Sequence, residues 1–170
     1  MKKIKQNLFT YIILIISTLI LFTMFLNIID KWIVGTVEFN NIKGTYVAFG
    51  HVIVGSFIGS VTIKLNPFIL ASYFLPFILS LVILFLNKNK KKKKALNSFK
   101  FLLLLVFIAV TIAFLTINHT TNAVINIIGY EKTDTLYNLD NNIKLGFGSI
   151  VSAILSGVGA LLLGYDLATK

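Results

Sequence analysis

The side chains that could do acid–base or metal chemistry in this chain are few and far apart. The two histidines are His51 and His119, and no aspartate or glutamate lies within four positions of either. A metal site would therefore need ligands from distant parts of the chain. Glu131, Asp134 and Asp140 share one polar stretch, but their spacing lacks the glycine and the fixed ligand positions of a calcium loop. We expect no metal or cofactor site and no catalytic residue.

The composition indicates that lipid is the solvent of this chain. Of its 170 residues, 56% are hydrophobic and 13% are charged, whereas a soluble domain usually carries about 25% charged residues. The net charge is +10, with no arginine and no cysteine, so disulfides and thiol catalysis are excluded. Nucleic-acid binding would need basic residues spread over one face with aromatics between them. These lysines instead flank apolar stretches, and we expect no nucleic-acid partner.

Four apolar stretches are long enough to cross a bilayer as helices. They cover residues 8–29, 68–86, 99–117 and 145–165. They contain no acidic or basic residue except Lys100, at the entry to the third. Because ion-coupled transport and intramembrane catalysis usually need ionisable groups between the helices, this pattern predicts a multi-pass protein of the cell membrane that is not an enzyme.

The segment 45–63 decides the number of spans. It is apolar and uncharged and contains Gly50, Gly55 and Gly59, which membrane helices tolerate where their neighbours pack closely. If it does not cross, the chain is an all-α four-transmembrane-helix bundle with an additional apolar re-entrant or interfacial segment. If it crosses, the chain has five transmembrane helices. Either way we expect one membrane domain, 1–170.

The distribution of lysines predicts the orientation. With four spans, both termini and the lysine loop 87–97 share one side, which we expect to be the cytoplasm, and the loops 30–66 and 118–142 are external. That side collects eleven of the sixteen lysines: Lys2, Lys3, Lys5, Lys88, Lys90 to Lys94, Lys100 and Lys170. With five spans the termini would lie on opposite sides, and the bias would fall to ten lysines against six.

The lysine loop itself has two interpretations. It is a topology determinant, or it also holds anionic lipid or an acidic cytoplasmic partner, at roughly 1 kcal/mol per lysine near the membrane surface. The residues concerned are Lys88, Lys90, Lys91, Lys92, Lys93 and Lys94.

A stripe of small residues runs along the last span. Its members are four positions apart: Gly148, Ser152, Ser156, Ala160 and Gly164. In lipid, small residues let helix backbones approach closely, and serine hydroxyls add hydrogen bonds. The stripe predicts helix–helix association, either inside one bundle or between copies. A narrow pore lined by Ser152 and Ser156 is a further alternative.

Short segments also hint at an internal repeat. Leu26-Asn27-Ile28-Ile29 is similar to Ile125-Asn126-Ile127-Ile128. Asn40-Asn41-Ile42-Lys43 matches Asn141-Asn142-Ile143-Lys144, and Phe49-Gly50 matches Phe147-Gly148. A biased Asn, Ile and Lys composition makes such matches common by chance. A true duplication in this register would pair 45–63 with the last span and favour five spans.

The overall pattern resembles small multispan membrane proteins of low-GC Gram-positive bacteria and mollicutes. The resemblance rests on Asn66-Pro67, Leu75-Pro76-Phe77, the lysine loop and Leu145-Gly146-Phe147-Gly148. It implies no activity and no site residues.

The sequence therefore predicts a structural or accessory subunit of a membrane assembly. Its partners would be the lipid bilayer and either another membrane protein or further copies of the chain. The alternatives are a small channel or passive transporter, and a bacteriocin immunity-type membrane protein.

Overall fold

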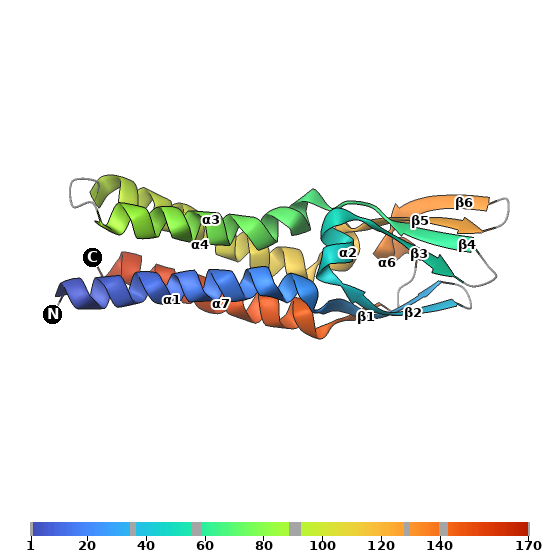
Figure 1. The fold of residues 1–170 in the computed structure, drawn as a ribbon, viewed down its shortest axis with the longest axis horizontal. Coiled ribbons are helices and arrows are strands. Elements are labelled where there is room, and N and C mark those ends of the chain that lie inside the picture. Colours follow the sequence, from blue (N-terminus) through green and yellow to red (C-terminus); the bar gives the residue numbers. More distant parts are fainter. Residues whose placement is uncertain are drawn as a thin grey trace.

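The computed structural model describes residues 2–34, 37–55, 59–88, 93–127, 130–139 and 143–169. Four long helices lie side by side, and the strands extend beyond one end of them (Figure 1). Both termini, the end of the second long helix and the start of the third lie at the opposite end. The long helices are α1 (Lys2–Phe22), α3 (Pro67–Lys88), α4 (Lys93–Leu115) and α7 (Phe147–Ala168).

Each of these helices provides a segment that is long and apolar enough to cross a membrane, and they are the four such segments among the described residues. This confirms the expected number of membrane-length helices. Around the bundle, α1 packs against α3 and α7, and α4 packs against the same two helices. Large apolar side chains also point outward, including Phe85, Phe101 and Leu161. A helix that is apolar on all sides suits a lipid environment.

In the described residues, seven strands form two antiparallel sheets at the far end of the bundle (Figure 1). The first sheet has the order β2-β1-β7, with β1 at Asn27–Val34, β2 at Val37–Lys43 and β7 at Lys144–Leu145. The second has the order β3-β4-β5-β6, and its strands are β3 (His51–Gly55), β4 (Gly59–Ile63), β5 (Asn122–Ile127) and β6 (Tyr130–Thr135). Short helical turns connect these parts: η1 (Thr23–Phe25), α2 (Gly44–Phe49), α5 (Ile117–Thr120) and α6 (Leu136–Leu139).

The sheets correct the prediction of an all-α chain. Both come mainly from the predicted loops 30–66 and 118–142, including the segment 45–63 that was expected to be re-entrant, interfacial or a fifth helix. Their pairing is long-range, since Ile63 on β4 lies opposite Ala123 on β5. Periodicity in a short window carries no information about such a partner, and this is why the strands were missed.

The segment 45–63 forms α2, β3 and β4 in its described residues, and no membrane-length helix. Gly50 follows α2 with a φ of 79°, a conformation that glycine adopts without steric cost and that ends the helix after 6 residues. The structure therefore gives no support to a fifth spanning helix. The first span also ends earlier than predicted, because residues 27–29 already belong to β1.

Candidate helix-association site

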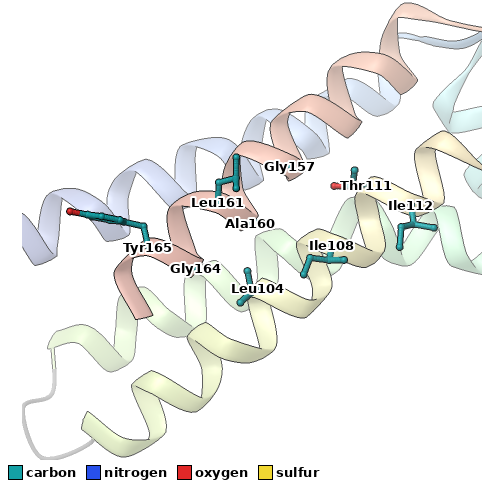
Figure 2. Close-up of a pocket in the computed structure, with 9 residues that line it drawn as sticks. All are labelled: Leu104, Ile108, Thr111, Ile112, Gly157, Ala160, Leu161, Gly164 and Tyr165. Carbon is teal, nitrogen blue, oxygen red and sulfur yellow. The ribbon is translucent and has the colours of Figure 1, made fainter. Parts of the chain in front are cut away.

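A groove of about 620 Å³ lies between α4 and α7 on the outside of the bundle (Figure 2). One wall consists of Leu104, Ile108 and Ile112, which follow each other at four-residue intervals along α4. The remaining lining residues are Thr111, Gly157, Ala160, Leu161, Gly164 and Tyr165. A side chain four positions along a helix lies almost directly above its neighbour, so the groove runs parallel to both helix axes.

Two glycines open the α7 side of this groove. A Cβ atom added to Gly157 or to Gly164 would meet no atom within 4 Å. Gly159, on the neighbouring face of α7, differs, because a Cβ there would come within 2.8 Å of the Phe107 ring. Close packing inside the bundle therefore requires a glycine at 159, whereas at 157 and 164 the missing side chains leave room outside it.

The groove offers apolar contacts. Leu161 is 77% exposed and lies between the two open glycines, and Tyr165 is 71% exposed. The hydroxyl of Thr111 donates to the Phe107 carbonyl and also bonds to Ser156 at 2.8 Å. A partner here would be held by close packing of apolar surface, as between membrane helices.

The predicted stripe of small residues divides into two parts. Gly148, Ser152 and Ser156 are buried within the bundle. The Ser152 hydroxyl donates to the Gly148 carbonyl at 2.8 Å and also bonds to the hydroxyl of Thr23. Ser156 likewise donates to the Ser152 carbonyl at 2.8 Å.

The other two members of the stripe, Ala160 and Gly164, line the outer groove. The same stripe thus serves internal packing at the strand end of α7, and it is open to the surroundings nearer the termini.

Three residues of the predicted lysine cluster belong to helices that end or begin at the end of the bundle carrying the termini (Figure 1). Lys88 ends α3 and Lys94 is in the first turn of α4, and both are exposed. Lys93 begins α4. The predicted residues Lys90, Lys91 and Lys92 lie outside the described residues.

The sequence reasoning missed a buried ion pair between Lys100 and Asp166. The two atoms Nζ and Oδ2 are 2.8 Å apart, and the side chains are 1% and 14% exposed. The ammonium also lies 5.6 Å from the centre of the Phe9 ring. Lys100 and Asp166 stand at the same end of two neighbouring antiparallel helices. Their opposite charges at matching ends of two predicted spans were the sequence signal that could have indicated this ion pair.

The histidines stay apart in the structure. His51 lies on β3 and stacks on the ring of Tyr46, with centroids 4.0 Å apart. His119 is exposed on α5. Among the described residues, no group of three or more His, Asp or Glu side chains could hold a metal ion.

Of the predicted acidic residues, Asp134 has defined partners. Its carboxylate accepts hydrogen bonds from the Asn138 amide at 2.8 Å and from the backbone N–H of Thr135 at 2.7 Å. These two bonds, that from Asn138 first, lower the pKa of Asp134. Glu131 is exposed on β6, and Asp140 lies outside the described residues. The hydrogen bonds of Asp134 hold the local turn between β6 and α6.

Comparison of the chain with protein-family models, with curated proteins and with solved structures finds no match.

Proposed function

We propose that this chain is a non-enzymatic, membrane-embedded accessory subunit that acts by helix–helix association through the α4–α7 groove. One observation carries the proposal. Gly157 and Gly164 leave open space on the outer face of α7, beside a ridge of apolar side chains on α4. Small residues that face outward from a bundle allow a further helix to approach closely, which strengthens dispersion contacts in lipid.

The proposed orientation has the termini in the cytoplasm and the two sheets outside. Both termini, the end of α3 and the start of α4 lie at the same end of the bundle (Figure 1), and the sequence from Lys88 to Lys94 is rich in lysine. Positive residues next to membrane spans favour the cytoplasmic side. The partner helix would then lie in the membrane, while the sheets project into the external space.

Crosslinking tests the proposal directly because the chain has no cysteine. A cysteine at Leu161 should crosslink to a partner in native membranes. A cysteine at Ile78, which is 50% exposed on α3 and does not line the groove, is the control. Equal crosslinking at both positions, or none at Leu161, would overturn the proposal. A product with twice the mass of the chain would identify the partner as a second copy.

Two substitutions that enlarge neighbouring side chains on α7 provide a second test of the proposal. Gly157→Ile should release the copurifying partner, because the new side chain occupies the groove. Val158→Ile alters the exposed residue beside it, which lies outside the groove, and should retain the partner. Loss in both variants or in neither would contradict the role of the groove.

A channel remains the alternative prediction. It requires solute or ion flux through proteoliposomes that changes on Ser156→Phe. The hydroxyls of Ser152 and Ser156 are engaged in bonds within the bundle, and for this reason we place the proposal on the groove.

A further inference from the structure

The two halves of the chain have the same order of elements. The first half runs α1, the hairpin β1–β2, α2, the strand β4 and α3, with β3 as an extra strand before β4. The second runs α4, the hairpin β5–β6, α6, the strand β7 and α7. We infer that the chain is an internal duplication of one helix–hairpin–helix unit, so that the surface of each half fits a second copy of the same unit.

Burial on the first helix of each half follows one register. Every pair in the following list is buried and 90 positions apart: Thr10 and Lys100, Ile13 and Leu103, Ser17 and Phe107, Ile20 and Val110, Met24 and Phe114. The buried residues Ile16 and Thr23 have half-buried counterparts in α4. Five of the seven buried positions of α1 and η1 thus have a buried counterpart in α4.

The second helices correspond in the same way with an offset of 80 positions. Their first residues, Pro67 and Phe147, already differ by this offset. The buried pairs are Ile69 and Ser149, Ser72 and Ser152, Tyr73 and Ala153, Pro76 and Ser156, Leu79 and Gly159, Ile83 and Leu163. The exceptions are Ser80 and Gly148, whose counterparts are less buried.

One hydrogen bond recurs at this offset. The Ser72 hydroxyl donates to the Phe68 carbonyl at 2.8 Å, and the Ser152 hydroxyl donates to the Gly148 carbonyl at 2.8 Å.

The bases of the two hairpins are closed by the same backbone bond. The N–H of Gly44, which begins α2, donates to the carbonyl of Leu26 at 3.0 Å. The N–H of Leu136, which begins α6, donates to the carbonyl of Thr121 at 2.9 Å. Each acceptor stands directly before the first strand of its hairpin. The helical period that the long helices share cannot produce this match, because the two backbone bonds lie outside those helices.

The contacts between the halves are reciprocal as well. In each half, the strand that leads into the second helix pairs antiparallel with the first strand of the other half, β4 with β5 and β7 with β1. The helices follow the same rule, since α3 packs on α4 and α7 packs on α1. Reciprocal contacts of this kind define an isologous interface, in which one surface is used twice around a two-fold axis.

Both units point the same way, because α1 and α4 each run toward the strand end (Figure 1). They therefore correspond to parallel repeats around an axis along the bundle. The segment matches seen in the sequence are out of this register. Asn40–Lys43 lie on β2 before a short helix, whereas Lys144 begins the strand that leads into α7.

A polar pair joins the two helices of each half near the termini. In the first half the Asn87 amide donates to the Thr10 hydroxyl at 3.2 Å. In the second half the ammonium of Lys100 donates to the Asp166 carboxylate at 2.8 Å. Thr10 and Lys100 match at the 90-residue offset, while Asp166 is one position short of the 80-residue offset from Asn87.

Exchanging these pairs between the halves tests the inference in the full chain. The four proteins are the parent, the lysine exchange T10K/K100T, the acid exchange N87D/D166N, and the variant with all four substitutions. All four have the same composition and net charge. Each single exchange breaks the ion pair between positions 100 and 166, and we expect its melting midpoint in detergent to fall by about 10 °C. The fourfold variant reunites the ion pair in the first half and should recover most of that loss.

A fourfold variant no more stable than the single exchanges would overturn the equivalence. A cysteine scan provides a second measurement that does not depend on these variants. Accessibility profiles of single cysteines along α1 and α4 should superimpose best at 90 positions, and those along α3 and α7 at 80 positions. A better fit at any other offset would contradict two equivalent units. Neither result depends on a partner binding the groove.

Discussion

The two halves of the chain share a backbone plan but fill it with different side chains. Where α7 has Gly157 and Gly164 on its outer face, the equivalent positions of α3 hold Phe77 and Leu84. Where α4 has the charged Lys100, α1 has Thr10. The same backbone arrangement thus accepts both sets of side chains at these equivalent positions. The open groove and the buried ion pair are therefore features of the second half, and the bundle does not require them.

The inner faces of the halves show a complementary exchange of size. In the second half a large residue on α4, Phe107, lies against Gly159 on α7. The equivalent positions in the first half hold the small Ser17 on α1 and the large Leu79 on α3. A close-packed interior needs one large and one small residue at such a contact, and either of the two helices can carry the large one.

The largest expected effect comes from reversing this size exchange. Phe107→Ser should lower the free energy of unfolding by about 3–5 kcal/mol, because it leaves a cavity. Gly159→Leu alone should cost about 1–3 kcal/mol through overpacking. The double variant copies the first half, and we expect it to be more stable than Phe107→Ser by at least about 1 kcal/mol. Unfolding in mixed micelles measures the stability of all three variants. If the loss in the double variant equals the sum of the two single losses, the two halves do not exchange size at this contact.

The polar pairs near the termini should differ in strength. Asp166→Asn leaves the buried Lys100 ammonium without its carboxylate, and we expect a loss of about 3 kcal/mol. Asn87→Ala removes a neutral hydrogen bond and should cost about 1 kcal/mol. Unfolding under the same conditions compares the two, and equal losses would mean that the second half gains nothing distinctive from its charges.

Asn66 marks a third difference, since its counterpart at the start of α7 is Gly146, which has no side chain. The side-chain oxygen Oδ1 of Asn66 accepts from the backbone N–H of Phe68 and Ile69, and its side-chain nitrogen Nδ2 donates to the Thr121 hydroxyl at 3.0 Å. Asn66→Ala should cost about 1–2 kcal/mol.

Asn66→Asp separates these two roles, because it keeps the acceptor for the helix end and removes the amide donor that reaches the other half. We expect its loss in thermal unfolding to be smaller than that of Asn66→Ala. The opposite order would mean that losing the donor and burying a carboxylate beside the Thr120 carbonyl outweigh the bonds to the helix end.

The smallest expected effect on stability is also the sharpest test of function. G157F/G164L gives α7 the residues that α3 carries at the equivalent positions. Because both sites are open and glycine is a weaker helix former than phenylalanine or leucine, the free energy of unfolding should not fall. Association measured by crosslinking at Leu161 should nevertheless be lost. Retained association would show that the groove is not the contact surface.

Much of the helical part of this fold could be predicted from the sequence, and its strands could not. Hydrophobic length and flanking lysines identify a spanning helix within a short window, so α3 was found nearly to its ends. The strands depend on partners distant in the chain, such as Thr62 opposite Val124. The small-residue stripe was visible as well, but which of its residues face inward depends on neighbouring helices that periodicity does not name.

The sequence by itself determined that the chain has four membrane-length apolar helices with a lysine-rich link, because these are properties of contiguous residues. The tertiary structure alone decided which residues meet. It brought Lys100 to Asp166, divided the stripe between core and groove, and placed the two halves in one register. Packing decides these matters, since the burial of a residue is set by the surfaces that surround it and not by its neighbours in the chain.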